Sequence, residues 1–208
     1  LLTPLGWLWA AVTARRLALH GTGARMGAPV ICVCNLTAGG AGKTPTVIAL
    51  VERLRARGVA AHVISRGHGG ALEGPLAVDP VRHTAQEVGD EPLLLAAFAP
   101  VWIGRDRAAA GRAAVAAGAR ALVMDDGFQN PGIAKDLSIV VVDAGFGFGN
   151  GRVMPAGPLR EPVAAGLARA DLLLAIGGTE ARAAFAAAWP ALPRAALAGE
   201  LRPLRTGM

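Results

Sequence analysis

Thr37-Ala38-Gly39-Gly40-Ala41-Gly42-Lys43-Thr44 follows the apolar run 30–34 and precedes an amphipathic stretch that starts at Pro45. A strand that ends in a glycine-rich turn and opens into a helix presents backbone N–H groups and the positive helix end to a polyphosphate. We predict that residues 37–44 bind a nucleotide, with Lys43 on the β and γ phosphates of ATP and the Thr44 hydroxyl on Mg²⁺. A glycine-rich turn with a chance lysine is the alternative.

The loop departs from the GxxxxGK[ST] pattern at one position. Thr37 stands where that pattern has its first glycine. Three glycines remain within the loop, so tight curvature and close approach of the backbone to a ligand are still available. We therefore keep the prediction of a nucleotide site.

Composition narrows the class of partner. The chain has 208 residues and a formal net charge of +6, which suits nucleic acid, anionic lipid surfaces or phosphorylated substrates. Aromatic residues are only 4% and tyrosine is absent, so a base-stacking platform for single strands is poorly supported. We expect a lipid or phosphate partner and no nucleic acid.

From residue 29, short apolar runs alternate with longer helical stretches. Strands are expected at 30–34, 60–64, 101–104, 121–124, 137–143 and 172–176, and helices at 45–57, 91–99, 106–117 and 163–169. This alternation predicts an α/β fold, with a mostly parallel, P-loop NTPase-like sheet and helices on both faces. Functional groups should then gather at the carboxyl ends of the strands.

The two cysteines, Cys32 and Cys34, lie on the first expected strand. We expect them to point to opposite faces of that strand, to remain unbonded and to act as small core residues in a reducing compartment.

The N-terminal segment, residues 1–20, combines leucines with Trp7 and Trp9 and is interrupted by the pair Arg15-Arg16. Its apolar part is too short to span a bilayer, but tryptophans beside an arginine pair suit a helix in the headgroup region. We predict a membrane-interface helix here, with a helix packed on the domain as the alternative.

The apolar run 121–124 ends in Asp125-Asp126. An aspartate at the end of a strand can hold Mg²⁺ opposite the hydroxyl of a phosphate loop. A solvated turn or a helix cap is the other interpretation of such a pair, and the presence of the loop favours the metal.

Five ordered motifs resemble one known family. CNLTAGGAGKTP (34–45), SRGHGG (65–70), VGDEP (88–92), DDGFQ (125–129) and GFGNGRVMPAGPLREP (147–162) are similar to motifs of tetraacyldisaccharide 4′-kinase, the lipid A 4′-kinase of Gram-negative bacteria. The resemblance implies transfer of the ATP γ-phosphoryl group to the 4′-hydroxyl of a tetraacylated glucosamine disaccharide 1-phosphate. It also implies a peripheral or monotopic enzyme on the cytoplasmic face of the inner membrane.

The resemblance implies roles for particular residues. Asp90 matches an aspartate thought to act as general base. Guanidinium groups fit phosphate oxygens, which makes Arg66, Arg105, Arg152 and Arg160 candidates for phosphate contacts, and the family motifs favour Arg66 and Arg160. Gln129 is expected to contact substrate. Glu161 is expected to join Asp125 and Asp126 near the metal, or to cap a helix that starts at Pro162. His68 and Asn130 depart from the family pattern.

The family also implies a longer, two-domain protein. We expect a P-loop kinase domain at 21–162 and the beginning of a second α/β domain at 163–208, in a chain truncated at its C-terminus. Two other functions remain open at this point. One is a truncated membrane-associated ATP-binding protein without transferase activity, and the other is a P-loop kinase for another small acceptor.

Overall fold

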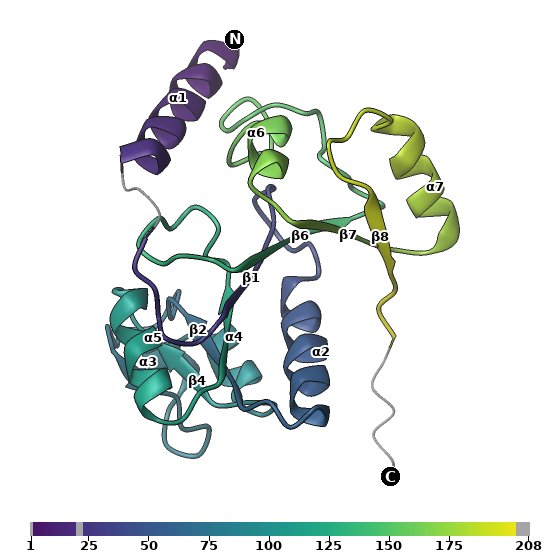
Figure 1. Cartoon of the computed structure of the whole chain (residues 1–208). Helices are drawn as coiled ribbons and strands as arrows, with labels where there is room; N and C mark the ends of the chain where they lie inside the picture. Colours follow the sequence, from purple (N-terminus) through teal and green to yellow (C-terminus); the bar gives the residue numbers. More distant parts are fainter. Residues whose placement is uncertain (1, 20–22, 203–208) are drawn as a thin grey trace.

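A computed structural model describes residues 2–19 and 23–202. Its centre is an eight-stranded sheet in the order β3-β4-β2-β5-β1-β6-β7-β8 (Figure 1). Every neighbouring pair is parallel except β3 with β4. The strands are β1 (Val30–Cys34), β2 (Ala61–Ser65), β3 (Leu76–Ala77), β4 (Val101–Ile103), β5 (Ala121–Asp125), β6 (Leu137–Asp143), β7 (Leu172–Ile176) and β8 (Ala196–Gly199). The predicted mostly parallel sheet is confirmed.

Helices cover both faces of this sheet. The helices of the described residues are α1 (Thr3–Leu19), α2 (Lys43–Ala56), α3 (Ala85–Val88), α4 (Asp90–Leu95), α5 (Arg107–Ala116), α6 (Val163–Ala168) and α7 (Thr179–Ala188), and no residue of α1 belongs to the core clusters. Buried residues of α2 and α4 share one hydrophobic cluster, and those of α5, α6 and α7 share the other. Figure 1 shows α2 across the sheet from α6 and α7. The two clusters lie on opposite faces because successive side chains of a strand alternate.

The six predicted strands are all present, with ends that differ by no more than one residue. Two short elements between β2 and α4, the strand β3 and the helix α3, were not predicted from the sequence. β3 has only two residues, too few for a periodic pattern. α3 is preceded by a capping box between Thr84 and Glu87, a signal that the sequence did contain. The helix expected at 91–99 is shorter, since α4 ends at Leu95.

The expectation that the two cysteines point to opposite faces is wrong. Residues two apart on a strand share a face, and Cys32 and Cys34 are both fully buried in the cluster that includes α5, α6 and α7. Both are free thiols, and Cys34 Sγ donates to the carbonyl of Ile139. Their expected role as small core residues is confirmed.

Residues 163–202 continue the same sheet. β7 pairs with β6 and β8 pairs with β7, both in parallel, so this segment lies beside the strands of the phosphate loop. The predicted division between a domain at 21–162 and a second one from 163 onward stays a prediction.

The motif at 147–162 forms a loop that we name the strap. Its Leu159 pairs antiparallel with Thr37, and the carbonyl of Pro158 accepts a 2.7 Å hydrogen bond from the N–H of Ala38. Phe148, at the other end of the strap, packs edge-on against two aromatic rings of the α7 region, Phe185 and Trp189. The strap therefore connects the phosphate loop to the α7 side of the sheet.

Helix α1 lies at the edge of the molecule (Figure 1), and its Trp9 Nε1 donates to the backbone carbonyl of Arg160 at 3.3 Å. Gly6 is its buried residue, and the backbone carbonyl of Val153 in the strap lies so close that a Cβ atom at position 6 would approach it to 2.8 Å. Trp7 and Leu8 are 71% and 62% exposed. In the described part of the chain, no helix is long and apolar enough to cross a membrane. The residue predicted to end this helix, His20, lies outside the described residues.

Replacing Leu159 by alanine should test how firmly the strap is held. Leu159 is fully buried, so Leu159→Ala should lower the free energy of unfolding by about 2–5 kcal/mol. Leu197→Ala is the matched control, because Leu197 on the edge strand is half exposed, and it should cost less than about 1 kcal/mol. Denaturant unfolding measures both, and equal losses would contradict a packed strap.

Candidate active site

The predicted phosphate loop joins the carboxyl end of β1 to α2. Thr37 lies in an extended pairing with Leu159 and so needs no glycine. Positive φ angles fall instead on Gly39 (114°) and Gly42 (82°), in the region that favours glycine. Gly42 has a second constraint, because a Cβ atom there would lie 2.6 Å from Ile176 Cδ1. The departure from the sequence pattern at Thr37 is therefore compatible with the loop.

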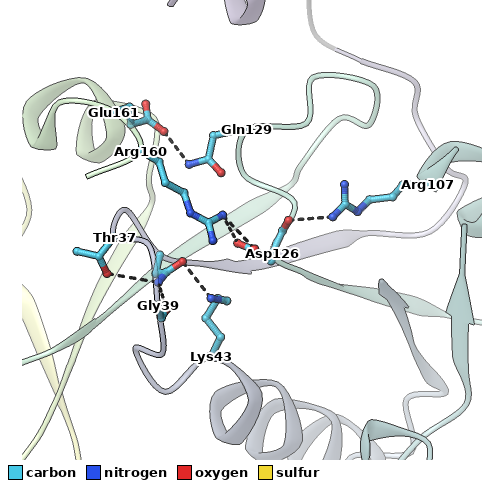
Figure 2. Close-up of polar contacts among 9 residues, drawn as sticks. Thr37, Gly39, Lys43, Arg107, Asp126, Gln129, Arg160 and Glu161 are labelled. Atoms are coloured by element: carbon cyan, nitrogen blue, oxygen red, sulfur yellow. Dashed lines mark hydrogen bonds and ion pairs between the residues drawn. The ribbon is translucent and has the colours of Figure 1, made fainter. Parts of the chain in front are cut away.

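Lys43, the first residue of α2, is only 9% exposed. Its Nζ donates a 3.0 Å hydrogen bond to Oδ1 of Asn35, a fully buried residue directly after β1. The Nδ2 group of Asn35 donates to the Gly39 carbonyl at 3.0 Å and to Thr37 Oγ1 at 3.4 Å (Figure 2). One side-chain amide thus contacts the start, the turn and the end of the loop.

Asp125 ends β5, the strand beside β1. It is 2% exposed, and its Oδ1 has no hydrogen-bond partner among the described residues. Burial raises the pKa of this carboxyl to about 7; the charges of Glu91 and Asp126 also raise it, while Lys43 and Arg107 lower it. A buried oxygen without a partner is costly, so this group suits a ligand that completes its coordination.

Asp126 has a φ of 50°, the left-handed conformation that aspartate tolerates better than most residues. Nη1 of Arg160, from the strap, donates to both of its carboxylate oxygens at 3.0 Å. Nη2 of Arg107 donates to its backbone carbonyl at 3.0 Å (Figure 2). The structure thus brings together two of the predicted site residues, Asp126 and Arg160, as a partly exposed ion pair.

The predicted magnesium ligands do not form a complete metal site by themselves among the described residues. Within residues 2–19 and 23–202, no group of three or more His, Cys, Asp and Glu side chains could hold a metal ion. Mg²⁺ commonly takes one or two carboxylates and completes its shell with phosphates and water. The unpartnered oxygen of Asp125 and the hydroxyl of Thr44 fit an ion that arrives with ATP. Their role stays a prediction.

Glu161 is 3% exposed and both of its oxygens have partners. Oε2 accepts from Arg169 Nη2 at 2.5 Å, and Oε1 accepts from Gln129 Nε2 at 3.0 Å (Figure 2). The arginine in turn lies 4.2 Å above the ring of Phe128. Glu161 therefore orients Gln129. It does not cap a helix, because Pro162 is the N-cap of α6 and no side chain caps this helix. Its predicted metal contact is not tested.

A cavity of about 540 Å³ opens beside the two aspartates, at the carboxyl ends of β2, β4 and β5. Most of its lining is charged, with five arginines and three carboxylates: Arg16, Arg66, Arg105, Arg107, Arg160, Glu91, Asp125 and Asp126. An excess of guanidinium groups suits a ligand that carries phosphate, since their donors match its oxygens.

The same cavity gathers several residues singled out from the sequence. Arg66, Gln129 and Arg160 all line it, together with His68 and Asn130. In contrast, Arg152 lies outside it and donates to Thr3 Oγ1 of α1 at 3.2 Å.

Asp90, the predicted base, is the first residue of α4 and is exposed. Its Oδ1 accepts from the backbone N–H of Glu91 at 3.0 Å. Glu91 lines the charged cavity and Asp90 does not. The structure thus places the predicted base next to the lining rather than in it.

Three site residues were missed from the sequence: Asn35, Glu91 and Arg107. The first two lie inside quoted motifs, at 34–45 and 88–92, so their presence in these motifs was the available signal. Arg107 follows Asp106, which caps α5, and nothing in the sequence indicated that its side chain reaches the backbone of Asp126.

Two further cavities flank the site. One, of about 210 Å³, lies between α1 and the body and shares Arg16, Gln129 and Arg160 with the charged cavity; its other lining residues include Trp9, Val12, Leu17 and Met154. The second, of about 290 Å³, lies across the phosphate loop, at the carboxyl ends of β6, β7 and β8. It is lined by Ala41, Gly42, Asp143, Ile176, Gly177, Gly178, Glu200 and Leu201.

Asp125 should make the stability of the protein depend on pH. Its folded-state pKa of about 7 lies above the ordinary value of 3.8, so the folded state binds the proton more tightly and loses stability as the pH rises from about 4 through about 7. Asp125→Asn should therefore raise the free energy of unfolding at pH 8 by up to about 4 kcal/mol and change it little near pH 4. Denaturant unfolding at several pH values measures the free energy of unfolding of both proteins. The same pH dependence in the unmodified chain and in Asp125→Asn would contradict this burial effect.

The chain is similar to proteins of one known family. A family model described as tetraacyldisaccharide-1-P 4′-kinase matches residues 1–206. Tetraacyldisaccharide 4′-kinases of Dinoroseobacter shibae and Jannaschia sp. are 68% and 59% identical over all of this chain, and it covers 62% and 63% of their lengths. That of Rhodospirillum centenum is 68% identical over 85% of the chain, which covers 52% of its length.

A solved structure is also similar. It is the "apo" form of LpxK from Aquifex aeolicus in complex with ATP, which is 31% identical, with a TM-score of 0.74. The match covers 84% of this chain and 57% of that one. The chain thus spans about 60% of the length of these relatives. Since the family model matches nearly the whole chain, the protein belongs to the tetraacyldisaccharide-1-phosphate 4′-kinase family.

Proposed function

We propose that this chain binds ATP and transfers its γ-phosphoryl group to the 4′-hydroxyl of a tetraacylated glucosamine disaccharide 1-phosphate. The observation that carries the proposal is the position of the phosphate loop, between the buried Asp125 and the cavity across the loop. Membership of the family supplies the identity of the acceptor. We propose residues 21–162 as the kinase domain and residues from 163 onward as the start of a second one.

Residues 37–44 would hold the phosphates through backbone N–H groups and the ammonium of Lys43. The hydroxyl of Thr44 and the carboxylate of Asp125 or Asp126 would hold Mg²⁺, which would supply positive charge to stabilise the transferred group. Glu161 would support this arrangement by orienting Gln129.

The two cavities beside the loop suggest how substrate and nucleotide are arranged. In phosphoryl transfer the attacking and leaving oxygens lie roughly in line, on opposite sides of the transferred phosphorus. The acceptor would approach from the charged cavity, on the β5 side of the loop. The nucleoside would then extend to the other side, into the cavity at the ends of β6, β7 and β8.

The acceptor needs a group that accepts the proton of its hydroxyl. We propose Asp90 as this base, because it opens α4 at the edge of the charged cavity and its neighbour Glu91 lines that cavity. Arg66 and Arg160 would contact phosphate groups, and Arg160 would first have to exchange its bond with Asp126.

Helix α1 is proposed to lie at the membrane surface, on the cytoplasmic face of the inner membrane. Its exposed Trp7 and Leu8 and its Arg15-Arg16 pair suit the boundary between lipid headgroups and acyl chains. The cavity beneath the helix lies next to the charged one, because Arg16, Gln129 and Arg160 line both. An amphiphilic acceptor could therefore place its sugar phosphate in the charged cavity while its acyl chains follow α1.

The test is transfer of labelled γ-phosphate from ATP to the tetraacyl disaccharide 1-phosphate. Lys43→Met should lower the rate at least about 100-fold through loss of transition-state charge stabilisation, and Asp90→Asn should lower it by about 10²–10⁴ through loss of the base. Asp106→Asn is the matched control, an exposed carboxylate at a helix start whose replacement still caps α5. The transfer rate of the Asp106→Asn variant should equal that of the unmodified chain.

No transfer by the unmodified chain would reject the proposed activity. If Glu91→Gln greatly lowers the rate of transfer and Asp90→Asn leaves it unchanged, the role of general base belongs to Glu91 and not to Asp90.

Membrane binding is tested separately by co-sedimentation with vesicles of anionic phospholipid. The double substitution Trp7→Gln, Leu8→Gln should weaken binding about tenfold or more, since both side chains would bury apolar surface in the interface. Val81→Gln is the control, because Val81 is 91% exposed in the distant loop before α3 and should leave binding unchanged. Equal binding by all three proteins would reject α1 as the anchor.

A further inference from the structure

The side chain of Asn35 lies at the base of the phosphate loop and is fully buried. A buried amide must have hydrogen-bond partners, because each unpaired polar atom costs free energy. Asn35 has partners on both ends of its amide: Oδ1 accepts from Lys43, and Nδ2 donates to Gly39 and Thr37. These partners fix the orientation of the amide. A flipped amide would set its NH₂ group against the ammonium and its oxygen against the Gly39 carbonyl.

The partner of Lys43 is uncharged. In the part of the chain that the structure describes, Lys43 forms no ion pair with a carboxylate, and Asn35 Oδ1 is its hydrogen-bond acceptor. A neutral oxygen holds the ammonium in place without cancelling its charge. A carboxylate at the same point would compete with phosphate for the ammonium. The choice of an amide therefore keeps the full positive charge available to an anionic ligand.

The second contact acts on the backbone of the loop. In a trans peptide unit the C=O and N–H groups point in opposite directions. Asn35 holds the carbonyl of Gly39, so the N–H of Gly40 is turned away from Asn35. The positive φ of Gly39 allows this orientation without strain. One side chain thus fixes the direction of a backbone donor as well as the position of a cation.

We propose that Asn35 is a positioning residue for the triphosphate: its amide holds the Lys43 ammonium and the Gly39–Gly40 peptide in the arrangement that receives the phosphates. This inference rests on the proposed nucleotide site. It assigns to Asn35 no contact with the reacting atoms. It differs from a packing role because most of its effect on ligand binding passes through Lys43, and the remainder through the Gly39–Gly40 peptide.

A double-mutant cycle separates these two roles. The ligand is the Mg²⁺ complex of a non-hydrolysable ATP analogue, and its Kd is measured by titration calorimetry for the unmodified chain, Asn35→Leu, Lys43→Met and the double variant. Asn35→Leu should weaken binding about tenfold in the unmodified background and less than about threefold once Lys43 is replaced, because residues that act through one another are not additive. Equal losses in both backgrounds would overturn the link to Lys43.

Asn35→Asp is the second variant, and it keeps the volume and an oxygen next to Lys43. It should fold and still bind the analogue more weakly than the unmodified chain, because the added carboxylate pairs with the ammonium permanently. Unchanged or tighter binding would overturn the inference. Ser138→Val in neighbouring β6 is the control for disturbance of the sheet core, and its Kd should stay unchanged.

Inorganic tripolyphosphate is the third arm. Asn35→Leu should weaken its binding by a factor similar to that for the analogue, since Asn35 is assigned to the phosphates alone. A loss confined to the ATP analogue would overturn the assignment. If the unmodified chain binds neither ligand, the proposed nucleotide site itself is wrong, and this inference with it. If it binds both and Asn35→Leu binds them equally well, only the inference is wrong.

Discussion

The pairing of the phosphate loop with the strap is the constraint on which the site depends. A loop that offers its N–H groups to a ligand must be held by its other backbone and side-chain groups, or it would collapse onto its own donors. Here the antiparallel bridge between Thr37 and Leu159 holds the start of the loop, and the bond from Ala38 to Pro158 holds the next residue. At the other end of the loop, Gly42 lies so close to the Ile176 side chain that a Cβ atom at position 42 would clash with it.

The strap also carries charge into the site. Arg160 follows Leu159 directly, so the residue that anchors the loop sets the position of the guanidinium on Asp126. Glu161 comes next and orients Gln129 from a buried position. Three consecutive residues thus contribute a packing contact, an ion pair and a hydrogen bond to a single site. This explains in physical terms why so long a loop has a defined conformation, since each of its residues here is tied to a different element.

The sheet and the phosphate loop could be predicted because their signals are local. Short apolar strands, glycines at fixed offsets and Lys43 are visible within a few residues of one another. The contact of Arg107 with Asp126 and the place of Glu91 in the cavity lining could not be predicted in this way, since each depends on where another segment of the chain lies in space. The contacts of Asn35 are with residues two, four and eight positions along the chain, and they depend on how the loop curves. The error about Cys32 and Cys34 was different in kind, because the period of a strand already places them on one face.

The charge balance in the site connects the buried aspartate with the loop. Asp125 has an unpartnered oxygen and a pKa raised to about 7 by burial, so the protein without nucleotide holds a carboxylate under strain from desolvation. Lys43 is close enough to lower that pKa, yet it is held by a neutral amide rather than by the carboxylate. If the two paired directly, each would satisfy the other and neither would need a ligand. Keeping them apart leaves a cation and a carboxylate both available, which is the condition that the proposed magnesium–triphosphate complex would require.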